Sequence, residues 1–276
     1  MKSYSVELKE NYPFLMGGTL SCLLMSQPWD VVQSWKRPAL IVVPGGGYSY
    51  ASKREGEPVA AEFFARGFQT FILNYVSAPE GGHYPEQLLE VAAAVDYVKK
   101  HAAEMNVNAD EVFVIGFSAG GHITGNLAIE YASVSQKVGC EIDCKPTAVG
   151  LCYPVISQKH GHQGSYNNLL EGYTDEAKAE LLKTLNLDEA VSENTPPAFL
   201  WATAEDACVP ADNALRYAAA LDKHGISYEL HIYPKGSHGL STCTLEINGQ
   251  SDALARARAW VDDCANFFRM FVAEPF

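Results

Sequence analysis

The sequence predicts an α/β fold, a doubly wound and mostly parallel sheet with a small cap insertion. Apolar runs of strand length, rich in β-branched and aromatic residues, alternate along the chain with amphipathic stretches of helical period. Such unbroken runs are typical of parallel strands that are buried on both faces. No internal repeat or low-complexity segment interrupts the alternation. The 276 residues are therefore expected to form a single domain, residues 1–276.

Composition narrows the classes of partner. The formal net charge is −13, which argues against a surface that binds nucleic-acid phosphates or anionic membranes. The first ten residues lack the apolar core of a secretory signal, and no apolar run is long enough to span a bilayer. The seven cysteines are scattered and odd in number, so we expect reduced thiols in a cytoplasmic protein and no metal site. The oligomeric state stays open, with a homo-oligomer as one alternative.

The first half of the chain is expected to open with an antiparallel hairpin and then to alternate strand and helix. Pro58 and Gly67 bound the first expected helix, because proline suits a first helical turn and glycine follows a last one. Tyr84-Pro85 opens a long helix whose apolar face runs from Leu88 to Ala102. The expected hairpin strands are residues 3–9 and 19–26, the buried strands are 39–43, 69–75 and 112–115, and a further helix covers 123–131.

The second half contains the predicted cap. Residues 157–195 are polar and broken by glycines, with one short helical stretch at 177–185. Because this segment falls between two strands at their carboxyl edge, we expect it to form a short cap over a site there. The elements expected around it are strands 148–153, 198–204 and 228–234, a helix opened by Pro210 and ended at Gly225, and a closing helix over 253–271.

The turn after the third buried strand is the strongest functional signal. Gly116-Phe117-Ser118-Ala119-Gly120 stands between the apolar run 112–115 and a helical stretch. Strand, Gly-x-Ser-x-Gly and helix in this order describe a nucleophile elbow, in which flanking glycines allow a strained turn that exposes the serine hydroxyl. Ser118 is therefore the predicted nucleophile, although a closely packed glycine turn without chemistry is the alternative.

A serine nucleophile needs a base and an acid that orients the base. Of the eight histidines, His238 in Gly236-Ser-His-Gly239 lies in a loop just past the last predicted strand, and it is the predicted base. Asp206 follows the preceding strand and is the predicted acid, with its neighbour Glu205 as the alternative. His122 is too close to Ser118 along the chain to turn back on it, and is expected to pack or to support the site.

The site also needs backbone N–H donors for the negative oxygen of the intermediate. Ala119, directly after the nucleophile, is expected to supply one. The amides of Gly46 and Gly47, in the glycine-rich turn after the first buried strand, are expected to supply the others, because glycine lets the backbone approach a substrate closely. A phosphate-binding loop is the competing interpretation of this turn, but no Gly-Lys-Ser/Thr follows it.

Four motifs together resemble the α/β-hydrolase superfamily, and within it the small acetyl esterases and lipase-like carboxylesterases, which include xylan and sugar esterases. The resemblance extends from about residue 19 to residue 271 and implies an α/β-hydrolase fold. It departs at Pro44, where many relatives have a histidine that braces the loop. The motifs are Pro44-Gly-Gly-Gly-Tyr48, Gly116-Phe-Ser-Ala-Gly-Gly-His122, Glu205-Asp206-Ala-Cys-Val-Pro210 and Gly236-Ser-His-Gly239.

The resemblance implies hydrolysis of a carboxylic ester through an acyl-serine intermediate, with no cofactor and a small-molecule ester as the partner. An arylformamidase and a small serine peptidase of the same fold stay open as alternatives, although such peptidases usually carry a large extra domain. A non-catalytic binding protein on a hydrolase scaffold also stays open, but it would be expected to lose a member of the Ser118, Asp206 and His238 set, which is complete here.

Substrate choice is predicted from the cap and the tyrosines. The short cap favours acetyl and other short acyl groups. Tyr48 and Tyr153 are candidate contacts for a sugar-like alcohol, with plain packing as the alternative; Tyr50, Tyr166 and Tyr173 are candidates of the same kind. Arg54 and Glu55 are expected to form an exposed ion pair in the loop, or else to contact a polar leaving group.

Overall fold

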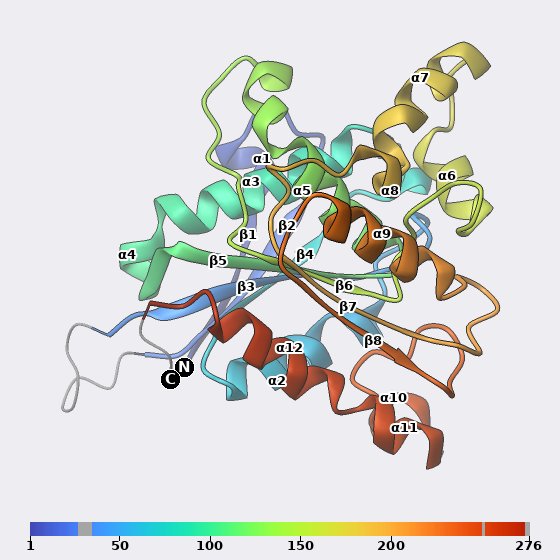
Figure 1. Ribbon diagram of the computed structural model, residues 1–276. Helices are drawn as coiled ribbons and strands as arrows, with labels where there is room; N and C mark the ends of the chain where they lie inside the picture. The colour runs from blue at the N-terminus through green and yellow to red at the C-terminus, as the bar shows by residue number, and fades with distance from the viewer. Residues whose placement is uncertain (27–34, 250–251, 274–276) are drawn as a thin grey trace.

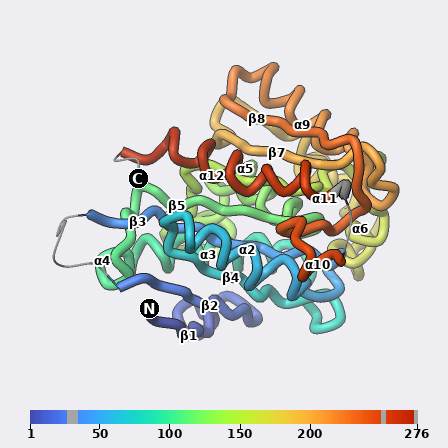
Figure 2. Tube along the Cα trace, turned by 90° about the horizontal axis from the view of Figure 1, so that it is seen from below, coloured from blue at the N-terminus to red at the C-terminus, as the bar shows by residue number. Residues whose placement is uncertain are grey.

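The computed structural model describes residues 1–26, 35–249 and 252–273. Its centre is an eight-stranded sheet in the order β1-β2-β4-β3-β5-β6-β7-β8, with the N-terminal hairpin at one edge and β8 at the other (Figure 2). The strands are β1 (Lys2–Glu7), β2 (Thr19–Leu24), β3 (Arg37–Val43), β4 (Gln69–Asn74), β5 (Val107–Phe117), β6 (Val149–Cys152), β7 (Ala198–Thr203) and β8 (Tyr228–Tyr233).

Strand direction divides the sheet into two parts. β1 pairs antiparallel with β2, and β2 pairs antiparallel with β4. All the other neighbours, from β4 to β8, are parallel. Parallel neighbours place their carboxyl ends at one edge of the sheet, which is where ligands bind in open α/β folds. The predicted entry hairpin and mostly parallel sheet are confirmed.

Helices cover both faces of the sheet (Figure 1). α2 (Glu57–Ala65) and α12 (Trp260–Arg269) lie on one face, and α3 (Glu86–Lys100), α5 (Ala119–Val138) and α9 (Asp212–Lys223) lie on the other. The shorter helices are α1 (Leu8–Asn11), η1 (Lys53–Glu55), η2 (Ala78–Glu80), α4 (Ala102–Met105), α6 (Gln163–Leu169), α7 (Asp175–Leu185), α8 (Leu187–Ala190), α10 (Leu245–Asn248) and α11 (Asp252–Ala257).

Around β3, two apolar clusters lie on opposite faces of the sheet. Along β3, Ile41 and Val43 join the cluster that contains α3 and much of α5, whereas Leu40 and Val42 join the cluster that contains α2 and α12. Alternate side chains of a strand point to opposite faces, so the unbroken apolar run is explained by burial on both sides. This scaffold fixes the strand ends from which the candidate site is built.

Several expected elements differ from those observed. β5 and α5 are both longer than the apolar runs at 112–115 and 123–131 suggested, and α5 ends only at Val138, before Gly139, which has a φ of 71°. The expected closing helix 253–271 is wrong as one element, because α11 and α12 are separate. The segment 157–195, predicted as a cap, contains α6, α7 and α8, and Figure 1 places α6 beyond the carboxyl ends of the strands.

Two general properties of the described residues bear on the sequence analysis. No helix among them combines the length and apolar character that crossing a bilayer requires. All seven cysteines are free thiols, and two of them, Cys140 and Cys208, are exposed.

Candidate active site

Ser118 lies at a sharp turn between β5 and α5. Its backbone has φ 52° and ψ −116°, a left-handed conformation that is costly for a residue with a side chain. The turn is so tight that a Cβ on Gly116 would lie 2.1 Å from the carbonyl oxygen of Gly120. A Cβ on Gly120 would lie 2.2 Å from the carbonyl oxygen of Val43. The Gly-x-Ser-x-Gly spacing is therefore required by the packing of β5, β3 and α5.

Two loops bring the predicted base and acid to Ser118. His238, after β8, has Nε2 2.8 Å from Ser118 Oγ. Asp206, after β7, has Oδ2 2.6 Å from His238 Nδ1. The carboxylate fixes the imidazole tautomer, because it accepts the Nδ1 proton and leaves Nε2 free to accept from the serine hydroxyl. The structure thus brings together all three residues that were predicted as catalytic.

Asp206 is held in place by its own turn. Its Oδ1 accepts hydrogen bonds from the backbone N–H groups of Cys208 and Val209, both at 2.9 Å. Its side chain is buried, so the carboxylate is shielded from water. A carboxylate fixed in this way orients the imidazole without having to rotate.

Glu205, the alternative acid, faces solvent on the other side of this turn. It forms an ion pair with Lys235 and accepts the N–H of Gly236. The hydrogen bond from Lys235 is the main cause that lowers the pKa of Glu205 below its ordinary value, followed by the backbone bond. Its contacts leave the orienting role to Asp206.

The loop after β3 places two predicted amide donors beside Ser118. Gly46 and Gly47 have φ values of 126° and 62°, conformations that favour glycine. Among the described residues, the backbone N–H groups of Gly46 and Gly47 donate no hydrogen bond to another backbone group. Ala119 is the first residue of α5, so its N–H has no acceptor within the helix. All three amides are available for an oxyanion.

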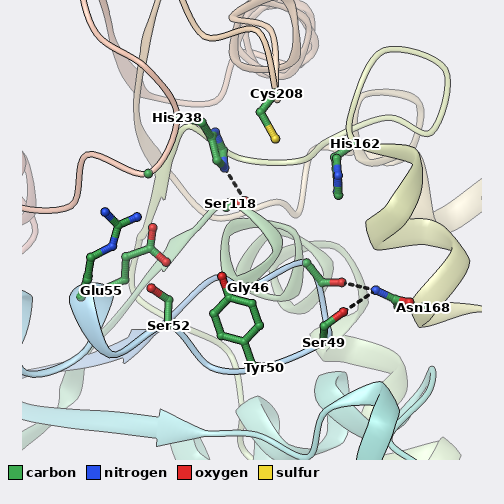
Figure 3. A pocket seen from close by; sticks show the side chains of 13 residues that line it. Gly46, Ser49, Tyr50, Ser52, Glu55, Ser118, His162, Asn168, Cys208 and His238 are labelled. Atoms are coloured by element: carbon green, nitrogen blue, oxygen red, sulfur yellow. Dashed lines mark hydrogen bonds between the residues drawn. The ribbon is translucent and has the colours of Figure 1, made fainter. Parts of the chain in front are cut away.

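The cap segment contacts this loop directly. Asn168, on α6, donates hydrogen bonds of 2.8 Å to the carbonyl oxygen of Gly47 and to Ser49 Oγ. Figure 3 shows both bonds at the side of the pocket. The cap therefore helps to fix the loop that carries the predicted oxyanion donors.

A pocket of about 320 Å³ opens above Ser118. Tyr50 and Ser52 lie on the opposite side of Ser118 from His238 and Cys208 (Figure 3). None of its described lining residues is Leu, Ile, Val, Met or Phe. The lining residues are Gly46, Gly47, Ser49, Tyr50, Ser52, Arg54, Glu55, Ser118, His162, Asn168, Cys208, His238 and Gly239.

Tyr48 and Tyr153, predicted as substrate contacts, belong to the framework instead. Each is only 2% exposed and neither lines the pocket. The Tyr48 hydroxyl is 2.6 Å from His122 Nδ1, and the Tyr153 hydroxyl donates to Glu55 Oε1 at 2.7 Å. Burial is the main cause that raises the pKa of both phenols well above the ordinary value. Their hydroxyls are engaged inside the protein, so a substrate cannot reach them.

Two further expectations about tyrosines and charges are revised. Tyr166 is also buried, whereas Tyr50 is 61% exposed and does line the pocket. The expected exposed ion pair of Arg54 and Glu55 is wrong, because Glu55 is 3% exposed and accepts hydrogen bonds from Tyr153 and from the Gly45 amide. The expectation failed because a charged dipeptide in a loop gives no indication of which side chain turns inward.

His122 supports the site without touching Ser118 Oγ, as expected. It is 1% exposed. Its Nε2 lies 2.8 Å from the carbonyl oxygen of Leu185, to which it must donate, so Nδ1 accepts from the Tyr48 hydroxyl. Burial lowers the pKa of His122 to about 4, which keeps the ring neutral in this arrangement.

Sequence reasoning missed the pocket residues that come from the cap and the turns. His162 and Asn168 lie in a segment without a motif, and Cys208 stands out only once Asp206 is placed two residues before it. Among the residues that the structure describes, no three His, Cys, Asp or Glu side chains gather where they could hold a metal ion.

The chain is similar in sequence to a protein named as a xylanase and to one named as an acetylxylan esterase. The chain is 35% identical over 221 residues to endo-1,4-beta-xylanase B of Butyrivibrio fibrisolvens, and 33% identical over 208 residues to an acetylxylan esterase of Xylanibacter ruminicola. These matches cover 77% and 73% of this chain. The chain spans only 34% and 40% of the length of those two relatives.

A solved structure matches over nearly the whole chain. It is an acetyl ester-xyloside bifunctional hydrolase from Caldicellulosiruptor lactoaceticus, with 31% identity, a TM-score of 0.81 and coverage of 97% of this chain and 96% of that chain. A family model described as BD-FAE matches residues 30–221. From the elbow, the sheet order and these matches, the chain belongs to the BD-FAE family of α/β-hydrolases.

Proposed function

We propose that the protein is a serine carboxylesterase that removes acetyl and other short acyl groups from a sugar-like alcohol. The observation that carries the proposal is the continuous hydrogen-bonded chain from Ser118 through His238 to Asp206, at 2.8 and 2.6 Å, on the floor of a polar pocket. The similarity to an acetylxylan esterase and to an acetyl ester-xyloside hydrolase supports the choice of ester and alcohol.

The geometry supports a two-step acyl transfer. Ser118 Oγ attacks the ester carbonyl while His238 Nε2 takes its proton, and the amides of Gly46, Gly47 and Ala119 stabilise the negative oxygen. His238 then protonates the leaving alcohol, which departs and leaves an acyl-serine. A water molecule, deprotonated by the same imidazole, attacks the acyl group, and Ser118 recovers its proton.

The pocket lining favours a small acyl group and a polar alcohol. Its described lining has hydroxyl, amide and imidazole groups and no aliphatic side chain beyond alanine size. An acyl groove would need an apolar lining, because each buried methylene contributes about 0.8 kcal/mol only where it leaves water. Exposed Tyr50 offers a ring face and a hydroxyl at the rim, which suits a sugar.

The cytoplasmic location expected from the sequence is part of the proposal, and the oligomeric state stays open. Seven free cysteines support a reducing compartment. Of the alternatives, an arylformamidase uses the same groups, so the experiment includes a formamide substrate.

The experiment compares p-nitrophenyl esters of increasing acyl length. We expect the highest kcat/KM from acetyl to butyryl and a value at least about tenfold lower for octanoyl, roughly 1.4 kcal/mol in barrier terms. Long chains should fail because the carbonyl can no longer align with Ser118 and the amides. A rate that still rises at octanoyl and decanoyl would contradict the short-acyl assignment.

Two controls complete the experiment. Ser118→Ala should lower kcat by about 10³-fold or more with an unchanged circular dichroism spectrum. Acetylated xylo-oligosaccharides and N-formylkynurenine, assayed in parallel, separate a sugar esterase from an arylformamidase. Preference for the formamide would replace the proposed function with that alternative.

A further inference from the structure

Glu55, the last residue of η1, is a buried carboxylate to which the mechanism above gives no role. It is 3% exposed although it lies at the wall of the pocket. None of the ion pairs found in the described residues includes it. A buried carboxylate without a cation must be stabilised by hydrogen bonds. The partners of Glu55 therefore indicate what it does.

One carboxylate oxygen holds the loop that carries the oxyanion amides. Oε2 of Glu55 accepts the backbone N–H of Gly45 at 2.8 Å, one residue before Gly46. The carbonyl of Gly45 is held as well, because it accepts the N–H of Ser52 at 2.9 Å. Both backbone polar groups of Gly45 are thus engaged inside the protein, and the N–H groups of the next two residues are left to face Ser118.

The other oxygen reaches the loop of the base through Tyr153. Oε1 of Glu55 accepts from the Tyr153 hydroxyl at 2.7 Å, and the same hydroxyl accepts the N–H of Ser241 at 2.9 Å. The Tyr153 ring packs edge-on against the His238 imidazole, with centroids 5.1 Å apart and planes at 74°. Tyr153 therefore contacts both the ring of the base and the backbone three residues after it.

We propose that Glu55 is a positioning residue that sets the oxyanion loop and the His238 loop relative to each other. The inference rests on the proposed function of the same site. The two loops follow β3 and β8, which are not neighbours in the sheet, so the sheet alone does not fix their separation. Glu55, with both carboxylate oxygens engaged, connects the oxyanion loop through Gly45 to the imidazole through Tyr153.

The chemistry of the link requires two acceptor oxygens on one side chain. Tyr153 already receives the Ser241 N–H, so its own proton has to go to an acceptor. Glutamine at position 55 has a single acceptor oxygen and an NH₂ donor. Whichever way its amide turns, it keeps only one of the two bonds, to Gly45 or to Tyr153. Glu55→Gln therefore preserves the shape of the side chain and removes one of the two hydrogen bonds, to Gly45 or to Tyr153.

The experiment measures Glu55→Gln beside a matched control, Glu57→Gln. Glu57 is exposed two residues further on and has no contact with Ser118 or His238. With p-nitrophenyl acetate we expect Glu55→Gln to lower kcat about 30-fold and to change KM less than about twofold, because alignment in the transition state is lost while binding remains. Glu57→Gln should match the wild type in both constants.

Hydrogen exchange, measured by mass spectrometry, gives a readout that does not depend on activity. In Glu55→Gln the peptides over 44–50 and 238–243 should exchange faster than in the wild type, with the rest of the sheet unchanged. Tyr153→Phe, which keeps the Gly45 bond, should affect only the second peptide and lower kcat less. It also serves as the decisive variant if Glu55→Gln does not fold.

Distinct outcomes separate the inference from the proposed function. A wild type that hydrolyses no ester contradicts the proposed function, and the exchange pattern still decides the role of Glu55. Unchanged kcat and unchanged exchange in Glu55→Gln would overturn the inference while leaving an active esterase. Faster exchange throughout the chain would also overturn it, because it would indicate general destabilisation.

Discussion

Neighbouring residues acquire opposite roles in the turn after β7. Asp206 points inward to His238 and is fixed by two backbone N–H groups, whereas Glu205 points to solvent and pairs with Lys235. The sequence places two carboxylates side by side at the expected strand end, and it favoured Asp206 only because that residue begins the turn. The hydrogen bonds of the turn supply the physical reason for that choice.

This difference predicts unequal effects of two conservative substitutions. Asp206→Asn should lower kcat by about 10⁴-fold, because an amide at this position no longer fixes the imidazole tautomer. Glu205→Gln removes only an exposed ion pair and should change kcat less than about twofold. Steady-state kinetics of both variants test the assignment. The opposite ranking would transfer the orienting role to Glu205.

The oxyanion loop shows what residue-level reasoning could not reach. Proline at position 44 left the loop without the histidine that braces it in many relatives. The structure provides contacts from elsewhere, with Glu55 on the amide of Gly45 and Asn168 on the carbonyl of Gly47. Both partners are distant in sequence or turned inward from a charged loop, so no local pattern indicates them. The glycines themselves were predictable because their spacing after an apolar run is local.

At the scale of elements, His122 connects three parts of the structure. It lies on α5, contacts the oxyanion loop through Tyr48, and contacts the cap through Leu185, which ends α7, and through Tyr166 on α6 at 3.2 Å. The bond from the Tyr48 hydroxyl requires the neutral ring, because it uses Nδ1 as its acceptor. A proton on Nδ1 would replace an acceptor with a donor facing a hydroxyl that already donates.

This network predicts a dependence of stability on pH. Because the folded pKa of His122, about 4, lies below its ordinary value of 6.5, the unfolded chain binds a proton first as the pH falls. The contribution of the neutral His122 ring to the free energy of unfolding is complete above pH 6.5. It decreases by about 3 kcal/mol in total as the pH falls to 4. Urea unfolding of the wild type and His122→Gln at several pH values should show their difference in unfolding free energy narrowing over this interval. A difference that stays constant would contradict the lowered pKa and the burial of His122 as a neutral ring.

At the scale of the whole molecule, two apolar clusters share one sheet. Leu40 on β3 and Leu73 on β4 are fully buried on opposite faces. The alternation of apolar runs with helical stretches was sufficient to predict this architecture, since strands that are buried on both faces are unbroken apolar runs. The sequence analysis overlooked the end of α5, which is marked by the left-handed Gly139, and it did not separate α11 from α12.

Because both clusters pack on the same sheet, we expect a cavity in either cluster to lower the stability of the whole fold. Leu40→Ala and Leu73→Ala should each lower the unfolding free energy by about 2 to 5 kcal/mol, through lost burial and a residual cavity. Circular dichroism and tryptophan fluorescence should report one coincident transition in each variant. Separate transitions by the two probes would show that the two faces unfold independently.

The crowding around the elbow has a consequence for how this site can change. A Cβ at position 116 or 120 would meet backbone carbonyls at 2.1 and 2.2 Å, which no rotation of a side chain can relieve. At position 118 the strain belongs to the backbone, and the Oγ points into an open pocket. The two glycines, which take no part in the chemistry, therefore tolerate substitution less well than the nucleophile Ser118 does. A saturation library should recover folded protein with cysteine or alanine at position 118, and none with any residue other than glycine at position 116 or 120.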